Sequence, residues 1–367
     1  MIAAVPREAA PNERRVALVP ESVSRLVKLG VVVHVGRGAG QRASFPDDLY
    51  EKAGASIVDD NATLARDADA LLCVRPPSDE LLALLRKSTT LVGFFNPLAD
   101  PGYLKRLAER GLTVLAVESI PRITRAQPMD ALSSQSNIAG YKAVLLAAAA
   151  LPRFFPMLTT AAGTIPPAKV FVIGAGVAGL QAIATARRLG AVVSGYDARP
   201  VVKEQVESLG AKFVQFEVAS AEGAGGYAKE LSAEQIAQQQ RAMAETIAKH
   251  DAVVTTAAVP GRPAPVIITE EAVKAMEPGS VIVDVAADTG GNCALTKRDQ
   301  TIVTPNGVTI VGTTNLASTM PYDASRLYSR NIFALISPFI KEGALVLDQE
   351  DDVIKGACVV RDGKVLV

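Results

Sequence analysis

The sequence predicts an α/β protein built from two open parallel-sheet domains that are separated by a cleft, with the chain returning to the first domain at its C-terminus. Three observations support this fold class. Short Val/Ile/Leu runs alternate with helix-like stretches, as in βα units. The 367 residues suffice for about two domains at roughly 150 residues each. A glycine-rich turn directly follows one of the predicted strands.

The first domain is expected to carry four buried strands with helices between them. A helix over 20–30 places apolar residues three and four apart and ends at Gly30, which is typical of a helix C-terminus. A second helix is predicted over 101–110. The strands are predicted over 31–35, 70–74, 91–95 and 113–117.

A polar stretch over 122–137 lacks core-forming periodicity and indicates the domain boundary. An Ala/Leu-rich helix over 138–151 is expected to connect the domains. The strands of the second domain are predicted over 169–173, 191–196, 250–255, 280–285 and 308–311. A helix over 324–336 and two short strands around Asp362-Gly363 follow. The predicted domains are therefore 1–133 with 322–367, and 134–321.

Composition excludes several classes of function. Lys and Arg total 38, as do Asp and Glu, so no net positive field attracts nucleic acid. The best apolar run, over 143–151, is too short to span roughly 30 Å of hydrocarbon, so no direct membrane insertion is expected. The N-terminus lacks a secretory signal pattern, which predicts a cytoplasmic protein. Three cysteines without paired spacing indicate a reduced chain and no metal site.

The glycine turn is the clearest candidate site. Gly174, Gly176 and Gly179 form a GxGxxG motif between the strand over 169–173 and a helix over 180–189. In a Rossmann-like domain the first glycine permits a tight turn, the second lets the backbone approach a pyrophosphate, and the third allows the helix to pack closely on the strand. The pyrophosphate is expected on the helix N-terminus, with Val177 and Ala178 in the same turn.

An acidic residue ends the next predicted strand. The Asp197 carboxylate is placed to accept both hydroxyls of a ribose and to repel a 2′-phosphate, which favours NAD(H) over NADP(H). Arg199 is the opposing signal, because an arginine can hold that phosphate. Ala198 and Ala258 complete the predicted cofactor-binding residues. The alternative is a tight βα turn that binds no ligand.

Several segments together resemble the alanine dehydrogenase and transhydrogenase superfamily. They are Pro6-Arg-Glu, Asn12-Glu-Arg-Arg15-Val-Ala-Leu-Val-Pro20, Phe45-Pro-Asp-Asp-Leu-Tyr50, Gly54-Ala and the glycine turn. Two further segments, 122–137 and Gly225-Gly-Tyr227-Ala-Lys-Glu230, resemble the Arg/Gln/Asp loop and the mobile loop of the NAD(H)-binding alpha subunit of proton-translocating transhydrogenase. Because the chain stops at Val367 with no hydrophobic extension, we expect the split form of that subunit, in which the membrane part is a different polypeptide.

The resemblance implies roles for individual residues. In that family the loop arginine, here Arg122, pairs with the aspartate, here Asp130, to hold the loop over the cofactor. The glutamine, here Gln127, reaches the nicotinamide ribose and helps to place the ring. The serine, here Ser133, contacts the carboxamide region. The mobile loop, with Gly226 and Tyr227 here, closes over bound nucleotide.

The same segments can be interpreted without the resemblance, and alternatives stay open. A polar Arg-x4-Gln-x2-Asp-x2-Ser string at a domain boundary lies where paired α/β domains form a cleft, but it is also typical of a solvated linker. The glycines of 223–226 beside one tyrosine suit a hinged lid, or equally a plain flexible loop.

The chain offers little acid–base chemistry. Reduction of a 2-oxo acid needs a proton donor at the carbonyl, whereas hydride transfer between two nicotinamides does not. His34 lies inside a predicted strand, and His250 is expected at the surface. Alanine dehydrogenases use an Arg, a Lys and a His in the first domain. At the Lys and His positions this chain has Arg75 and Asn96, neither of which shuttles a proton.

The resemblance therefore implies an NAD(H)-binding transhydrogenase subunit that is nearly inactive alone. It implies a homodimer, an NADP(H)-binding beta subunit and a membrane-spanning alpha-2 subunit as partners, and a position at the cytoplasmic face of the inner membrane. An NAD-dependent amino-acid dehydrogenase and a catalytically silent NAD-sensing module are the alternatives. Arg15, Arg75 and Asn96 are expected to be structural or to line a vestigial pocket.

Overall fold

The computed structural model describes residues 1–216, 233–258 and 261–367, with side chains of 233–237 excepted. The chain forms two compact units. Unit 1 comprises 1–136 and 317–367, and unit 2 comprises 137–316. The predicted boundaries after residues 133 and 321 lie close to these divisions and remain predictions. Among the described helices, none combines the length and apolar character needed to cross a membrane.

Unit 1 contains an eight-stranded sheet in the order β19-β18-β6-β5-β4-β1-β2-β3. Strands β1 to β6 run parallel to their neighbours, while β18 pairs antiparallel with β6 and β19. The strands are β1 Ile2–Val5, β2 Val32–Gly36, β3 Ser56–Val58, β4 Ala70–Leu72, β5 Thr90–Gly93, β6 Thr113–Ala116, β18 Cys358–Arg361 and β19 Lys364–Val365. The C-terminal chain thus returns to the first sheet, as predicted.

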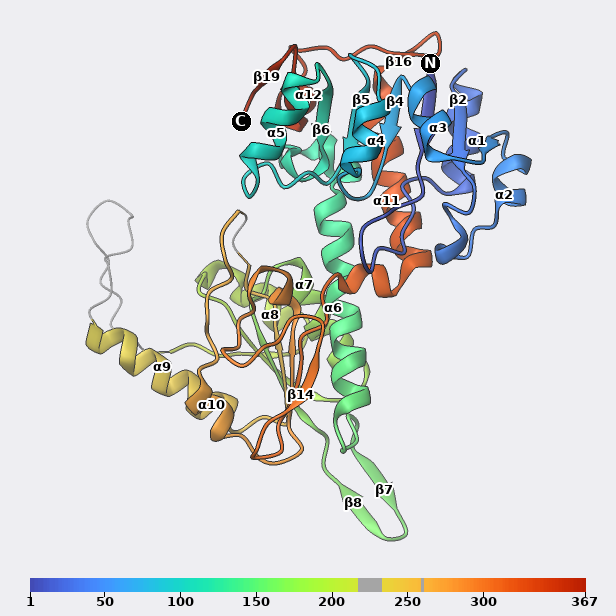
Figure 1. The fold of residues 1–367 in the computed structure, drawn as a ribbon. Helices are drawn as coiled ribbons and strands as arrows, with labels where there is room; N and C mark the ends of the chain where they lie inside the picture. Colours follow the sequence, from blue (N-terminus) through green and yellow to red (C-terminus); the bar gives the residue numbers. More distant parts are fainter. Residues whose placement is uncertain (217–232, 259–260) are drawn as a thin grey trace. The chain divides into compact units, whose positions relative to one another are not determined.

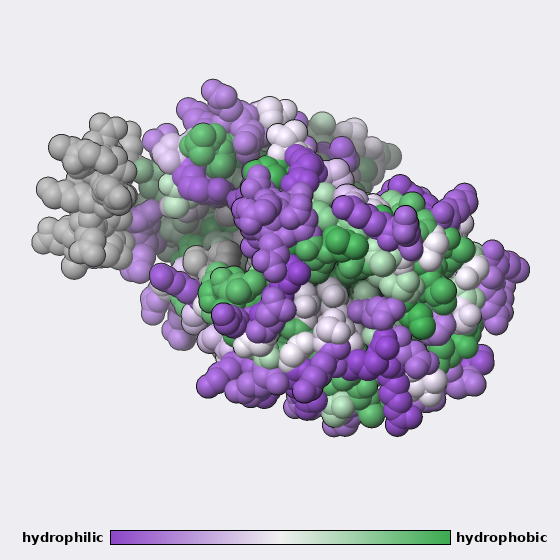
Figure 2. Space-filling model, turned by 90° about the horizontal axis from the view of Figure 1, so that it is seen from above, coloured by the Kyte–Doolittle hydropathy of each residue, from purple (hydrophilic) through white to green (hydrophobic). Residues whose placement is uncertain are grey.

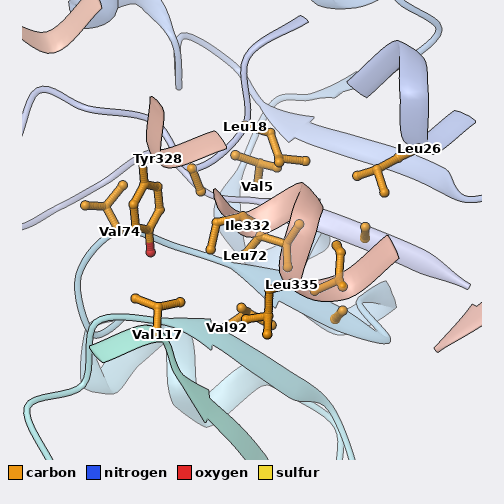
Figure 3. Packing of buried hydrophobic residues seen from close by; sticks show 14 of the residues in the cluster. Val5, Leu18, Leu26, Leu72, Val74, Val92, Val117, Tyr328, Ile332 and Leu335 are labelled. Atoms are coloured by element: carbon orange, nitrogen blue, oxygen red, sulfur yellow. The ribbon is translucent and has the colours of Figure 1, made fainter. Parts of the chain in front are cut away.

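Helices cover both faces of this sheet because successive strand residues point to opposite faces. Leu71 and Leu91 pack with helices α3, α4 and α5, whereas Leu72 and Val92 pack with α1 and α11. In Figure 3, Tyr328, Ile332 and Leu335 of α11 lie over the strand residues Leu72 and Val92. The helices are α1 Pro20–Lys28, α2 Asp47–Lys52, α3 Asn61–Asp67, α4 Asp79–Leu84, α5 Pro101–Glu109, α11 Pro321–Ile336 and α12 Asp352–Ala357.

Unit 2 contains a seven-stranded sheet in the order β11-β10-β9-β12-β13-β15-β14. Only β14 runs antiparallel to its neighbour within this described sheet. The strands are β9 Lys169–Ile173, β10 Val192–Tyr196, β11 Lys212–Phe213, β12 Ala252–Thr255, β13 Val281–Asp284, β14 Thr301–Val303 and β15 Thr309–Val311. This is a doubly wound sheet, in which ligands bind beyond the carboxyl ends of the strands.

The second sheet is also covered on both faces. Val170 and Val172 pack with α6 and α7, and Phe171 and Ile173 pack with α9 and α10. The helices are α6 Ala131–Ala150, α7 Val177–Arg188, α8 Lys203–Ser208, α9 Ala233–Ile247 and α10 Glu270–Lys274. A hairpin of β7 Leu158–Thr160 and β8 Gly163–Ile165 projects away from the rest of unit 2 (Figure 1).

The structure corrects the expected starts of α6 and α11. The helix predicted over 138–151 begins at Ala131, because the Asp130 carboxylate accepts a hydrogen bond from the Ser133 N–H at 2.8 Å and caps it. The helix predicted from 324 begins at Pro321, whose missing N–H costs nothing at that position. Strands β1, β3, β11 and β14 and the hairpin β7–β8 are not among the sequence predictions.

The surface of the described residues carries both hydrophilic and hydrophobic side chains. On the face shown in Figure 2, areas of hydrophilic side chains separate smaller hydrophobic ones. Cys73, Cys293 and Cys358 are all free and buried.

Candidate functional site

The glycine turn of unit 2 connects β9 to α7. Gly174 has a φ of +94°, a left-handed conformation that favours glycine. Its N–H donates to the Tyr196 carbonyl oxygen at 2.8 Å, which ties the turn to the end of β10. The helix begins at Val177 rather than at the predicted Leu180, with Gly176 as its N-cap.

The three glycines differ in the space that a side chain would have. A Cβ atom on Gly174 would lie 2.6 Å from Thr256 Oγ1, and one on Gly179 would lie 1.7 Å from the Gly174 carbonyl oxygen. At Gly176 nothing in the described chain lies within 4 Å of such an atom. Gly174 and Gly179 are therefore required by packing, whereas the space beside Gly176 is open to a ligand.

The start of α7 fits an anionic group. The first amides of an α-helix have no intrahelical partner. In the described part of the protein no side chain caps those of α7. Val177 is 41% exposed, and Ala178 is partly exposed. Partial positive charge at a helix N-terminus and free N–H donors together bind phosphate groups. These residues fit the pyrophosphate of a dinucleotide.

Asp197 follows the end of β10 and contacts the glycine turn directly. Its Oδ2 accepts the Ala175 N–H at 2.7 Å, and Arg199 donates to both carboxylate oxygens. Burial opposes ionisation, but the hydrogen bonds from Arg199 and Ala175 lower the pKa of Asp197. The carboxylate is therefore charged at neutral pH. Ala198 beside it is exposed.

A loop after β12 supports the glycine turn, and sequence reasoning found only its exposed Ala258. Thr256 Oγ1 donates to the Gly174 carbonyl oxygen at 3.0 Å. Asn292 binds Ala257, the residue after Thr256, at both backbone groups. Its side-chain oxygen accepts the Ala257 N–H at 3.0 Å, and its Nδ2 donates to the Ala257 carbonyl oxygen at 2.8 Å. Thr256 directly follows β12, and this position at the carboxyl end of a strand is the signal that could have identified it.

Asp284 organises the loop that carries Asn292. It is fully buried at the end of β13, and its carboxylate accepts five hydrogen bonds, at 2.6 to 3.1 Å, from Thr255, Ala286, Asn292, Cys293 and Thr296. Such complete satisfaction is what makes a buried carboxylate tolerable. An acid at a strand end was used to identify Asp197 and would equally have identified Asp284.

The Arg/Gln/Asp loop lies in unit 1 and is held by neighbours on both sides. Residues Thr124–Met129 form a 3₁₀ helix with buried Ala126 and Met129. Asn331 of α11 donates to the Pro128 carbonyl at 2.7 Å. Arg125 forms two hydrogen bonds to Asp351, at 2.7 and 2.9 Å. This loop is thus a built element of unit 1.

Among the four predicted loop residues, Asp130 and Ser133 contact each other, whereas the pairing of Arg122 with Asp130 stays a prediction. Arg122 is exposed, and among the described ion pairs none joins it to Asp130. Asp130 instead caps α6 through the Ser133 N–H. Gln127 is exposed and Ser133 partly so. Gly226 and Tyr227 lie outside the described residues.

Models of known families cover nearly the whole chain. Residues 4–139 match the N-terminal domain, and residues 143–367 match the C-terminal domain, of alanine dehydrogenase/PNT. The chain belongs to the alanine dehydrogenase/PNT family. The expected family is thereby confirmed.

Members of the alanine dehydrogenase/PNT family differ in their similarity to this chain. The first part of NAD(P) transhydrogenase subunit alpha of Rhodospirillum rubrum is 47% identical to this chain, and the match covers 99% of this chain and 97% of that protein. The solved transhydrogenase of Sinorhizobium meliloti has a TM-score of 0.90 and 45% identity, with both chains fully covered. Alanine dehydrogenase of Bacillus subtilis is 31% identical over 88% of this chain and 81% of its own. The transhydrogenase branch is the more similar.

Arg15, the arginine that this chain shares with alanine dehydrogenases, is bound by residues of unit 1. Arg15 is 3% exposed. It donates to Glu13 at 2.7 and 2.8 Å and to Gln135 at 2.8 Å. Arg75 adds a 3.3 Å contact to Glu13. Because Glu13 and Gln135 occupy the Arg15 guanidinium, this residue joins the N-terminal segment to the start of α6.

Asn96 and His250, two of the residues considered for proton transfer, are both held by neighbours. Asn96 is exposed, and its N–H donates to the Glu118 carboxylate at 2.5 Å. His250, expected at the surface, is half-buried and stacks on Phe171 with 5.0 Å between ring centroids. Burial lowers the pKa of His250, and its Nδ1 bonds the Thr246 carbonyl at 2.7 Å. Within the described residues no His/Cys/Asp/Glu cluster could hold a metal ion.

Proposed function

We propose that this chain binds NAD(H) in unit 2 and presents it to NADP(H) on a partner, as the NAD(H)-binding subunit of a proton-translocating NAD(P) transhydrogenase. The glycine turn with Asp197 at the neighbouring strand end carries the cofactor assignment. The 47% identity to the transhydrogenase subunit of Rhodospirillum rubrum supports the reaction.

The residues present fit a reaction without proton transfer to substrate. Bound NADH would supply a hydride, and its transfer to a second nicotinamide creates no oxyanion that needs an acid. The protein then has to orient the ring, to within roughly 3 to 3.5 Å of its acceptor, and to exclude water. Asn96 and Arg75, at positions where alanine dehydrogenases have His and Lys, cannot serve as proton shuttles at neutral pH.

The loop of unit 1 supplies the proposed positioning residues. Gln127 has an exposed side chain on an anchored 3₁₀ turn, which suits contact with the nicotinamide ribose. Ser133 is proposed to contact the carboxamide region, and Arg122 to pair with Asp130 when the loop holds nucleotide. Gly226 and Tyr227 are proposed to close over the bound cofactor.

The proposed partners follow from the family. NADP(H) would be held by a beta subunit, and a separate membrane-spanning alpha-2 subunit would couple hydride transfer to proton movement. The matching Rhodospirillum rubrum protein is itself named as one portion of an alpha subunit. We place the chain at the cytoplasmic face of the inner membrane through these partners.

We further propose that the chain forms a homodimer through the hairpin of unit 2. Residues 154–168 contain no charged side chain, and every residue from 159 to 166 is exposed. Met157 is 62% exposed and Ile165 42%. An isolated two-stranded hairpin is marginally stable in water. Because an uncharged surface meets its own copy without repulsion, a second chain is the occupant that it fits.

One experiment tests the reaction. The chain is mixed with the NADP(H)-binding domain of a bacterial transhydrogenase, and reduction of an NAD analogue by NADPH is followed. The proposal predicts turnover that requires both proteins. Binding of NADH without turnover in any such mixture would instead identify an NAD-sensing module.

The amino-acid dehydrogenase alternative has its own test. It predicts that the chain alone reduces NAD⁺ with alanine or a related amino acid. We expect no such reaction across a panel of amino acids. Turnover of any of them would overturn the transhydrogenase assignment.

A further inference from the structure

The Asp197 carboxylate is fully engaged within its own unit. Oδ1 accepts the Arg199 N–H at 2.9 Å and Nε at 3.0 Å. Oδ2 accepts the Ala175 N–H at 2.7 Å and Arg199 Nη2 at 3.1 Å. A carboxylate offers about four acceptor positions. Ribose hydroxyls therefore cannot bind Asp197 unless an existing donor leaves.

Of the present donors, the guanidinium is the one that can move. The Arg199 side chain is 60% exposed, whereas that of Asp197 is 9% exposed. Ion pairs with such an exposed partner are weak. The Ala175 N–H, by contrast, belongs to the glycine turn, where the N–H of Gly174 is bound to Tyr196. Displacement of the Arg199 guanidinium therefore breaks neither of these two hydrogen bonds of the turn.

We propose that Arg199 is a specificity-determining residue that occupies Asp197 until the adenosine ribose of NAD(H) displaces it. This inference rests on the proposed binding of NAD(H) in unit 2. The ribose diol replaces two guanidinium N–H donors with two O–H donors, so the carboxylate stays satisfied. A 2′-phosphate, which is ionised at neutral pH, offers no such donors.

Arg199 then has opposite effects on the two dinucleotides. For NAD(H) it is an internal competitor that weakens binding. For NADP(H) its positive charge compensates the repulsion between the Asp197 carboxylate and the 2′-phosphate. Arg199 therefore reduces the difference in affinity between NAD(H) and NADP(H). Removal of the guanidinium should increase the preference for NAD(H), because NAD(H) binds more tightly and NADP(H) binds more weakly.

The test is the dissociation constant of the full chain for NADH and for NADPH, measured by dihydronicotinamide fluorescence at fixed ionic strength. Arg199→Ala should bind NADH about threefold more tightly and NADPH at least tenfold more weakly than the unmodified chain. Arg199→Lys, which keeps the charge but loses the bidentate fork, should also bind NADH more tightly while NADPH affinity changes by less than threefold.

Matched variants exclude general effects. Arg188→Ala removes an exposed arginine from the same unit and should change neither constant. Asp197→Asn should reduce the difference between NADH and NADPH, and Arg199→Ala added to it should no longer tighten NADH binding. Thermal unfolding of each variant verifies folding. If Arg199→Ala does not fold, the Lys variant decides.

The outcomes separate the two proposals. Weaker binding of both dinucleotides by Arg199→Ala would make Arg199 a ligand contact and overturn the competitor role. Unchanged constants would overturn it as well. Failure of the unmodified chain to bind NADH would overturn the proposed function itself, and the inference with it.

Discussion

Gly140 of α6 lies directly against Ala178 at the start of α7. A Cβ atom on Gly140 would lie 2.0 Å from the Ala178 carbonyl oxygen and 2.8 Å from its carbonyl carbon. The absence of a side chain lets the connecting helix touch the turn that is proposed to bind pyrophosphate. Gly140 thus supports the glycine turn, although three strands, β7, β8 and β9, separate the two along the chain.

Gly140→Ala should destabilise unit 2 despite the better helix propensity of alanine. The gain of about 1 kcal/mol from propensity is outweighed by overpacking, which costs roughly 1 to 3 kcal/mol or more. Denaturant unfolding of the full chain measures the loss. Gly102→Ala in α5, where the nearest atom to a Cβ lies at 3.4 Å, is the control and should leave stability unchanged or raise it by up to about 1 kcal/mol. Equal stability of the two variants would contradict the steric argument.

Gly176→Ala and Gly179→Ala should separate binding from folding. The space beside Gly176 is open, and its φ of −76° suits alanine, so the melting temperature should not change. NADH should bind at least tenfold more weakly because the methyl group occupies the pyrophosphate position. Gly179→Ala should lower the melting temperature itself. A Gly176→Ala protein that binds NADH normally would argue against the predicted pyrophosphate site.

Gln127→Asn should slow hydride transfer much more than it weakens NADH binding. The side chain is exposed, so shortening it by one methylene leaves the fold intact but withdraws the amide from the nicotinamide ribose. We expect at least a tenfold fall in the transfer rate and at most a threefold change in the NADH dissociation constant, since orientation is the contribution removed. Gln41→Asn, another exposed glutamine of unit 1, should change neither. Equal losses in rate and binding would contradict the positioning role.

Glu8→Gln should remove part of the pH dependence of stability. The Glu8 carboxylate accepts the N–H groups of Val74 and Arg75 at 2.5 and 3.2 Å. Burial raises its pKa from 4.5 to about 7, with Glu13 also raising it and Arg15 opposing. Because the folded state holds the proton more tightly, the contribution of Glu8 to stability is fully present below its ordinary pKa and is lost as the pH rises through about 7.

Melting temperatures measured from pH 5 to pH 8 check this expectation. The unmodified chain should lose more stability over that range than the Glu8→Gln variant. Glu109→Gln, which neutralises an exposed carboxylate at the end of α5, should follow the unmodified chain. Parallel curves for all three proteins would show that Glu8 does not titrate in this range.

Met157→Asp together with Ile165→Asp should convert the proposed dimer to a monomer. Both positions lie at the exposed hairpin, and paired charges across an interface with a second copy repel each other. Light scattering gives the mass in solution. Thr164→Ser on the same hairpin is the conservative control. A monomeric unmodified chain, or a double variant that stays dimeric, would place the interface elsewhere or exclude it.

Local patterns predicted much of the fold. The strand over 169–173 and the turn after it were identified exclusively from a buried apolar run and glycine spacing, and β9 has the same bounds. Helix starts were less predictable, because the Asp130 cap and Pro321 extend α6 and α11 beyond their apolar periodicity. The hairpin over 158–165 was missed because all of its residues except Leu158 are exposed, so it carries no amphipathic pattern.

Residue patterns were enough to predict the fold class, the family and the positions of Gly174, Gly176, Gly179 and Asp197, because such patterns are formed by neighbours close along the chain. The contacts of those groups became known from the folded chain. It pairs Arg15 with Gln135 across 120 residues, sets Gly140 against Ala178, and brings the Asp197 carboxylate to the Ala175 N–H of the glycine turn. Such contacts depend on how strands and loops distant in sequence meet at the edge of a sheet, and residue spacing alone does not encode which donor a carboxylate accepts.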